Sequence, residues 1–227
     1  MSKKIYLSPS NQDGNMYAYG NTTECEQCNR IADAAKNALE RCGFEVKKAP
    51  KGQEMKTSIS ESNKWGADLH IPIHTNATTN SGTGTAVGTV VFVYNTAAAN
   101  MALAEPIYSA VQDVTPGGTD YGVRENPELA ELNSTSAVAV YIEVDFHDNP
   151  TVAKWLVENT AAVGEAIAKG VCEGYGVTYK DPEKPAPADV FYRVQVGAYN
   201  DRKNAEAFLS QVKKAGFTNA FIVEVKR

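Results

Sequence analysis

Residues 67–77 read ADLHIPIHTNA, and this stretch decides the fold. Its apolar residues alternate with histidine and proline, and a period of two is typical of a β-strand. Pro72 cannot donate a backbone hydrogen bond, so we expect the strand to lie at the edge of a sheet or to be irregular there. Thr75 and Asn76 read as the strand leaving the sheet. In α/β folds ligands bind at that edge, and we interpret His74 as a metal ligand.

Strand-like and helix-like segments alternate on both sides of this stretch. Strands are predicted at 4–7, 44–46, 89–94 and 137–144, and helices at 28–42, 58–65, 97–114 and 151–174. This alternation predicts an α/β fold with a mostly parallel twisted sheet and helices on both faces.

The C-terminal part of the chain has a different pattern. We expect a main domain over residues 1–179 and a proline-rich linker over 180–189, followed by a small βαβ unit over 190–227. The strands of this unit are predicted at 191–197 and 220–225. One helix on two strands buries too little apolar surface to be stable alone.

Composition narrows the class of protein. The chain has 227 residues, of which 43% are apolar and 22% charged, as in ordinary globular proteins. Its net charge of −5 argues against a general partner among nucleic acids or anionic membranes. No apolar run approaches the ~20 residues of a transmembrane helix. The first residues enter a strand directly, so we expect synthesis in the cytoplasm without a signal peptide.

Cys25 and Cys28 form a C-x-x-C pair at the start of a helical pattern. Such a pair occurs in redox proteins and in zinc sites, which usually contain a second pair. The sequence holds no second pair, so we favour two reduced cysteines of a helix, at least one of them in the core. A redox or metal protein built on this pair is the weaker alternative.

The sequence contains three histidines, so any site that depends on histidine must use one or more of these three. His70 and His74 lie four residues apart, which is ~13 Å along a strand, so they cannot both bind one ion. His74 stands at the strand's end and is the better ligand candidate, whereas His70 is interpreted as a packing residue. His147 follows the strand at 137–144 and either reaches the same space or packs under its loop.

Two acidic residues complete the candidate set. Glu143 ends an apolar strand, where a carboxylate is costly to bury unless it is paired, metal-bound or catalytic. Its alternative role is a helix cap or salt bridge at the sheet edge. Glu24 precedes a long helix, where the helix dipole favours an acid. Together with His74 these residues fit a mononuclear zinc hydrolase, in which zinc activates water and a separate carboxylate acts as the base.

Residues 4 to about 177 resemble the zinc-dependent N-acetylmuramoyl-L-alanine amidases of the amidase-3 family, which are peptidoglycan hydrolases. The opening stretch is similar to the family's strand ending in Ser-Ile-His-x-Asn-Ala, which makes His74 a zinc ligand. The segment that begins at Glu24 resembles that of the family's ligand glutamate. Residues 141–150 resemble its Glu-x-Gly-Phe … Asn-Pro motif, so the resemblance implies that Glu143 is the catalytic glutamate.

The chain departs from this family at its first zinc ligand. The family's first histidine follows strand one, where this chain has Asn11 or Gln12 instead, and Asp145 replaces a glycine. Three outcomes are expected. Gln12 or Asn11 binds the metal weakly, His147 replaces the missing histidine, or the metal site is degraded and the domain only binds the cell wall.

Residues 191–227 resemble the first half of a SPOR domain, a module that binds peptidoglycan strands stripped of their peptides. The segment YRVQVGAY at 192–199 and the helix around Phe208 carry this resemblance. Half a module leaves an apolar sheet face and an open edge. We therefore expect the unit to form a homodimer with a second copy or to dock on the main domain.

The resemblance implies an enzyme that cleaves the amide between N-acetylmuramic acid and L-alanine in bacterial peptidoglycan. Zn²⁺ would activate the water, and Glu143 would be the general base. Without a signal peptide, we expect the protein to reach the cell wall after lysis, as a phage-type endolysin or a mother-cell autolysin does. The rival from another class is a catalytically degraded peptidoglycan-binding protein.

Overall fold

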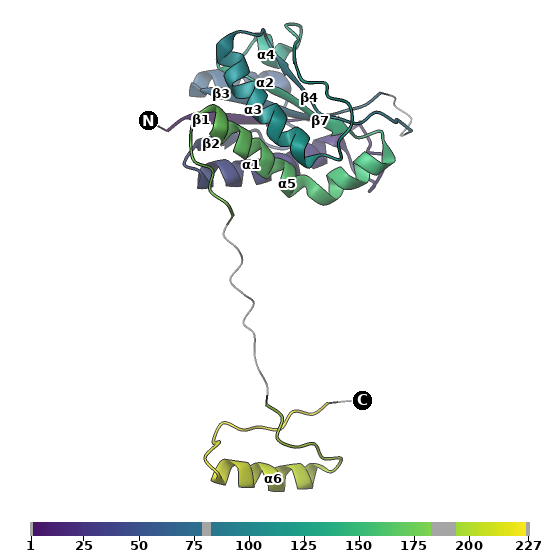
Figure 1. Ribbon diagram of the computed structural model, residues 1–227, viewed down its shortest axis with the longest axis vertical. Coiled ribbons are helices and arrows are strands. Elements are labelled where there is room, and N and C mark those ends of the chain that lie inside the picture. The colour runs from purple at the N-terminus through teal and green to yellow at the C-terminus, as the bar shows by residue number, and fades with distance from the viewer. Residues whose placement is uncertain (1, 79–82, 183–193, 226–227) are drawn as a thin grey trace. The chain divides into compact units, whose positions relative to one another are not determined.

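The computed structural model describes residues 2–78, 83–182 and 194–225 (Figure 1). The chain divides into two compact units, residues 1–182 and 183–227, and each is treated by itself. The predicted linker at 180–189 lies outside the described residues beyond Pro182. Among the described helices, none combines the length and the apolar character that crossing a membrane requires.

The first unit alternates strands and helices along the chain. Its elements are β1 (Lys4–Pro9), α1 (Glu24–Arg41), β2 (Glu45–Lys48), α2 (Met55–Trp65), β3 (Leu69–Asn76), β4 (Val90–Val93), α3 (Ala98–Val114), β5 (Val123–Glu125), α4 (Ala130–Asn133), β6 (Val138–Ala139), β7 (Tyr141–Phe146) and α5 (Pro150–Gly174).

All strands belong to one sheet with the order β2-β1-β3-β7-β4-β5, and β6 pairs with β3 beside β7. Every pairing is parallel except that of β4 with β7. The predicted α/β fold with a mostly parallel sheet is therefore confirmed.

Pro72 lies inside the sheet, within the continuous strand β3, so the expectation of an edge strand is wrong. β3 pairs with β1 on one side and with β6 and then β7 on the other. The carbonyl of His70 accepts from the backbone N–H of Val140, so residues 70 and 72 turn the same side toward the junction of β6 and β7. The missing N–H of Pro72 therefore falls where the neighbouring strand is interrupted.

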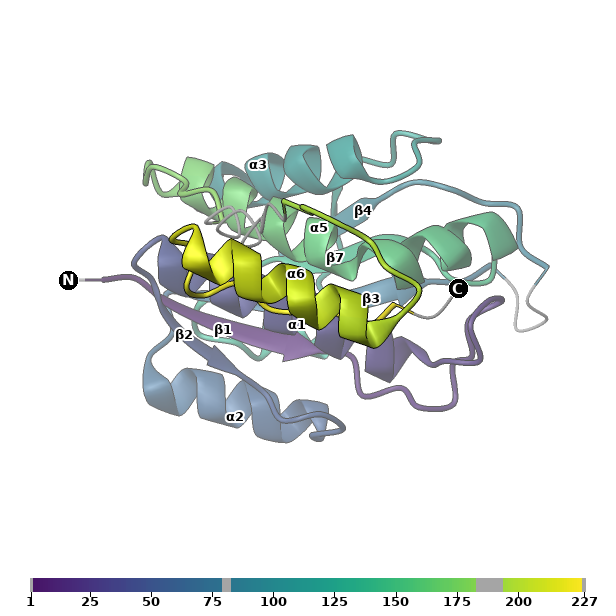
Figure 2. The ribbon, with the colours of Figure 1, turned by 90° about the horizontal axis from the view of Figure 1, so that it is seen from below.

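Different helices lie against the two faces of the sheet (Figure 2). On one face the side chains are buried and apolar, as Leu7, Ile71 and Ile142 show, and α1, α3 and α5 cover them. The other face carries His70 and His74, as well as other polar and aromatic side chains, and α2 and α4 lie there. Most of the core lies on the first face, and the candidate site lies on the second.

Local sequence signals fix the ends of the helices next to the site. Thr23 caps α1, and its side chain accepts from the N–H of Glu26. Gly66 ends α2 in the left-handed conformation, with φ of 69°. Asn149 caps α5 directly before Pro150.

Cys25 and Cys28 are buried on α1 as free thiols, in agreement with their interpretation as helix residues of the core.

The second unit differs from its predicted βαβ pattern. Its helix is α6 (Arg202–Lys214), capped by Asp201. Residues 194–197 and 220–225, which were predicted as strands, carry no strand, and residues 191–193 lie outside the described part of the chain. Apolar and polar residues do alternate in these segments, as they would in a strand. A strand forms only when it pairs with neighbouring strands, however, and half a module contains few strands to pair with. Several large apolar side chains of this unit are exposed, among them Val194, Val196, Phe217, Phe221 and Val225.

Asp145 connects the start of β4 to the end of β7. Its fully buried carboxylate accepts from the backbone N–H groups of Gly88 and Phe146, each at 2.8 Å. Gly88 has φ of 123°, and a Cβ there would lie 2.3 Å from the carbonyl oxygen of Thr119. Burial raises the pKa of Asp145. Asp145 thus holds the segment leading into β4.

We expect Asp145→Asn to preserve stability and Asp145→Ala to lower the free energy of unfolding by about 1–3 kcal/mol, because alanine leaves two buried N–H groups without an acceptor. The raised pKa also predicts that the contribution of Asp145 to stability falls as the pH rises above about 4, since at this group the native state then binds more protons than the unfolded state. Asp145→Asn should flatten that slope. Both tryptophans, Trp65 and Trp155, lie in the first unit, so urea unfolding followed by their fluorescence measures this unit. Equal stability of the two variants would contradict the role of Asp145.

Candidate active site

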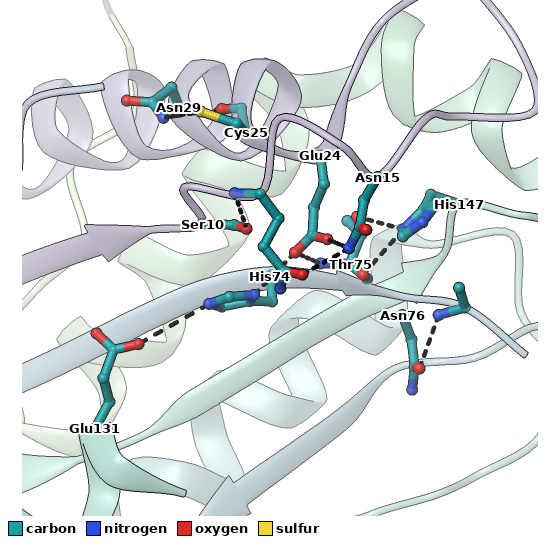
Figure 3. Close-up of polar contacts among 12 residues, drawn as sticks. Ser10, Asn15, Glu24, Cys25, Asn29, His74, Thr75, Asn76, Glu131 and His147 are labelled. Atoms are coloured by element: carbon teal, nitrogen blue, oxygen red, sulfur yellow. Dashed lines mark hydrogen bonds and ion pairs between the residues drawn. The ribbon is translucent and has the colours of Figure 1, made fainter. Parts of the chain in front are cut away.

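The end of β3 brings His74 against the first residue of α1. Nδ1 of His74 lies 2.8 Å from Oε1 of Glu24, and the two residues are only 9% and 1% exposed (Figure 3). The pairing of β3 with β7 shifts register between His74 and Asn76, an irregularity of the kind that re-aims side chains. The two residues predicted as metal ligands are thus in direct contact.

Glu143 stands opposite His74 in the ladder between β3 and β7. The residue is partly buried, but its Oε2 is shielded from solvent and has no hydrogen-bond partner among the described residues. Burial raises the pKa of Glu143 to about 7, and the nearby His74 opposes this shift. A buried carboxylate with a near-neutral pKa is the kind of group that functions as a general base.

Glu131 on α4 is a site residue that the sequence reasoning missed. It is 4% exposed, and its Oε2 lies 3.9 Å from Nε2 of His74. Its Oε1 accepts from the hydroxyl of Ser8 at 2.5 Å and lies 3.2 Å from Nε2 of His70. The only signal in the sequence is an acid between Leu129 and Leu132, in a segment where no helix or strand is predicted.

Aromatic rings hold both histidines of β3 in place. The ring of Tyr141 stacks on His74 with a centroid distance of 4.6 Å and an interplanar angle of 18°. Tyr6 stacks on His70 at 5.4 Å and 6°. His70 is fully buried, as expected for a packing residue, yet its contact with Glu131 links it to the site.

The loop after β1 reaches Glu24 through Asn15. The amide nitrogen of Asn15 donates to Oε2 of Glu24 at 2.7 Å and to Oε1 of Gln12 at 2.8 Å. The backbone N–H of Gln12 in turn donates to the hydroxyl of Ser10 at 3.2 Å. The side chain of Asn15 therefore bridges the side chains of Gln12 and Glu24.

His147 contacts the same strand end from another direction. Its Nδ1 lies 3.0 Å from both the carbonyl oxygen and the hydroxyl of Thr75, and its ring stacks on Tyr17 at 5.1 Å. Burial lowers the pKa of His147. Because Nδ1 donates to the carbonyl, the lone pair of the neutral ring is at Nε2.

A cavity of about 310 Å³ opens beside these residues. Its walls come from the loop after β1, the start of α2, α4 and the strand ends, and they include Gln12, Gln53, His74, Glu131 and Tyr141. His74 and Glu131 are thus accessible to a bound molecule.

The residues fit a divalent metal ion through Glu24 and His74. Imidazole nitrogen and carboxylate oxygen are the donors that a hydrolytic zinc uses, and here they converge within 2.8 Å. The partnerless Oε2 of Glu143 is a further sign of a missing polar partner. In the described ranges, however, no three His, Cys, Asp or Glu residues are grouped to hold a metal. In the geometry of the described residues, the pair of Glu24 and His74 thus has no third His, Cys, Asp or Glu ligand in place.

We expect Thr75→Val to lower the free energy of unfolding by about 1–3 kcal/mol, because it removes the hydroxyl that lies 3.0 Å from the Tyr17 hydroxyl in a buried place. Tyr17→Phe removes the other partner. In the double variant no hydroxyl is left unpaired, so its cost should be smaller than the sum of the single costs. A double-mutant cycle measured by urea unfolding gives this difference. Strictly additive costs would show that the contact between the two hydroxyls contributes nothing to stability.

Known proteins resemble both units of the chain. A family model described as N-acetylmuramoyl-L-alanine amidase matches residues 9–173, and a model described as SPOR domain matches residues 173–226. An uncharacterized 38.4 kDa protein of Clostridium perfringens is 29% identical over 144 residues, which are 61% of this chain and 41% of that protein. The chain thus spans less than half the length of this relative.

Solved amidase structures share the fold of the first unit. The N-acetylmuramoyl-L-alanine amidase of Clostridium difficile 630 has a TM-score of 0.69 at 22% identity, covering 77% of this chain and 97% of that one. AmiC2 of Nostoc punctiforme has a TM-score of 0.67 at 18% identity and the same two coverages. The CwlV catalytic domain of Bacillus (Paenibacillus) polymyxa var. colistinus has 0.67 at 19%, covering 78% and 99%. At these identities the likeness shows the fold alone, but the family model covers most of the chain. The chain therefore belongs to the N-acetylmuramoyl-L-alanine amidase family.

Proposed function

We propose that this protein cleaves the amide between N-acetylmuramic acid and L-alanine in bacterial peptidoglycan. The observation that carries the proposal is the meeting of Glu24, His74 and Glu143 at one end of β3 and β7. These three are the residues to which the family resemblance assigns metal binding and catalysis. The cavity beside them gives a substrate access to His74.

In this proposal Glu143 is the general base and then the acid. It accepts a proton from the attacking water and passes it to the amine that leaves as the amide bond breaks. Its pKa of about 7 suits both steps, since the group must bind and release one proton near neutral pH. Tyr141 supports the reaction indirectly by keeping the imidazole of His74 in one plane.

A zinc ion would be held by Glu24 and His74, with Gln12 or His147 as the third ligand. When bound, zinc polarises the amide carbonyl and lowers the pKa of its water. Gln12 is favoured by its position, because Asn15 joins its side chain to Glu24. His147 is favoured by its chemistry, because the lone pair of its neutral ring is at Nε2, where imidazoles bind metals.

The second unit is proposed to hold the enzyme on the cell wall. The SPOR match over residues 173–226 supports binding to peptidoglycan, and tethering raises the local concentration of the catalytic unit. Action after cell lysis, as an endolysin or autolysin, belongs to the same proposal. Pairing of two such units in a homodimer stays a prediction.

A second candidate function is peptidoglycan binding without catalysis. It is favoured by the loop after β1, where Asn11 and Gln12 stand in place of a histidine, and by the absence of a three-residue His, Cys, Asp or Glu cluster in the described part of the chain. Purified sacculi incubated with the protein and added zinc separate the two functions. Release of new amino groups supports the amidase, and sedimentation with the sacculi without release supports the binding protein.

We expect Glu143→Gln to reduce amine release by about 10²–10⁴-fold, because the amide cannot accept the proton of water. Sedimentation with sacculi should be unchanged, since that variant keeps the shape of the site and the whole second unit. Glu165→Gln, in the ion pair between α5 and Arg41, is a control for the loss of a carboxylate elsewhere. Wild-type rates in Glu143→Gln would remove Glu143 from the mechanism.

The third ligand is identified by the zinc content of purified variants. If Gln12 is that ligand, Gln12→Ala should lower the zinc affinity while His147→Ala keeps it near that of the wild type. The opposite pattern identifies His147. Zinc per protein is measured by atomic absorption after dialysis against a weak chelator. Stoichiometric zinc in both single variants would exclude both residues and leave water in the third position.

A further inference from the structure

Two cysteines outside the candidate site lie at neighbouring ends of α1 and α5. Cys42 is the C-cap of α1, and Cys172 lies in the last turn of α5. The two helices pack side by side on the apolar face of the sheet (Figure 1). Both cysteines are free thiols and belong to the same hydrophobic core, although they lie far apart along the chain.

The two thiol groups contact each other directly. Burial, and then a side-chain hydrogen bond with Cys42, raise the pKa of Cys172 to about 12. A disulfide has an S–S distance of about 2.05 Å and joins Cβ atoms that are about 3.5–4.5 Å apart. Two thiols that already share a hydrogen bond therefore need only a small movement to form that bond.

The chain that follows α5 lies across both cysteines. The backbone N–H of Val177 donates to the carbonyl of Cys172 at 2.8 Å, and that of Lys180 donates to Sγ of Cys42 at 3.4 Å. Nε of Arg41, the residue before Cys42, donates to the carbonyl of Lys180 at 2.9 Å. These contacts hold the surroundings of the pair in place, so the meeting of the two thiols is a feature of the fold.

We propose that Cys42 and Cys172 form a disulfide when the folded protein meets a small-molecule disulfide, and that this bond stabilises the first unit by joining α1 to α5. The inference concerns residues that the proposed function does not use, and it does not depend on a metal ion. Cys42 is the better attacking group, because it is 6% exposed whereas Cys172 is 1% exposed.

The reaction is a thiol–disulfide exchange in two steps. The thiolate of Cys42 attacks one sulfur of the small disulfide, whose S–S bond breaks and releases one small thiolate. The thiolate of Cys172 then attacks the sulfur of Cys42 and releases the second small thiolate. The two protons lost by the cysteines go to the two released thiolates. The protein is oxidised by two electrons, and the small disulfide is reduced by the same two.

The bond would close a long loop that contains every strand from β2 to β7. Such a cross-link restricts the unfolded chain more than the folded one, in which the two residues already touch. We therefore expect the oxidised protein to unfold at a temperature about 5–15 °C above that of the reduced protein.

The test incubates the reduced full-length protein with oxidised glutathione below its unfolding temperature. Trypsin places the four cysteines in three peptides, namely 42–47, 170–180, and 5–30 with both Cys25 and Cys28. Mass spectrometry should find peptides 42–47 and 170–180 joined, with the loss of two hydrogen atoms. Dithiothreitol should separate the two peptides and reverse the rise in unfolding temperature.

Two variants serve as controls. Cys172→Ser should form no such cross-link, and oxidised glutathione should leave its unfolding temperature unchanged. Because serine is more polar than cysteine, each variant is compared with its own reduced form. Cys25→Ser removes a buried cysteine at the other end of α1, so it is the matched control and should still form the bond between Cys42 and Cys172.

Three results would overturn the proposal. In the first, Cys42 and Cys172 stay reduced or stay joined to glutathione. In the second, the bond forms between Cys25 and Cys28 alone, which is the pairing that an unfolded chain favours because its loop is the shortest. In the third, Cys42 and Cys172 are joined but the unfolding temperature does not rise, which would remove the stabilising role.

Discussion

The structure depends on the burial of three carboxylates around one imidazole. Glu24, Glu131 and Glu143 all act electrostatically on His74, and each comes from a different element. Gathering like charges away from water is unfavourable unless a cation compensates them. The imidazolium form of His74 supplies part of that compensation, and the contacts raise its pKa despite burial. The sheet tolerates this cluster because its apolar face, under α1, α3 and α5, contains most of the core.

The separation of an apolar face from a polar face of the sheet explains how the rest of the fold is arranged. The β3 residues of even number face the site, and those of odd number, such as Ile71 and Ile73, face the helices. A single strand therefore serves the core and the site at the same time. Tyr6 and Tyr141 provide flat rings on the polar face, so the histidines are held by stacking where aliphatic packing is absent. Substitutions on one face are thus expected to act on stability, and substitutions on the other to act mainly on chemistry.

The sequence predicts those features that depend on local patterns. The α/β class, the caps at Thr23 and Asn149 and the end of α2 at Gly66 are all local signals, and the structure has them. Glu24 and His74 are 50 positions apart, so their grouping in one site depends on the chemistry of the two residues and on the family resemblance, and their direct contact is seen only in the structure. Glu131 was missed because its role comes from tertiary contacts with β1 and β3, and nothing in its neighbours' periodicity marks it. The position of Pro72 inside the sheet depends on the break between β6 and β7, and no local sequence pattern indicates that break.

The contact between the start of α1 and the end of β3 also has a thermodynamic consequence. Neither half of the pair formed by Glu24 and His74 is a binding site in the unfolded chain, where the two residues are far apart. Any ion held there is bound by the folded state alone, so its binding free energy adds to the stability of the whole sheet. Metal supply would then set the lifetime of the protein against proteolysis as well as its rate of reaction. If the proposed ion binds there, a metal-poor medium would shorten the lifetime of the folded chain for the same physical reason.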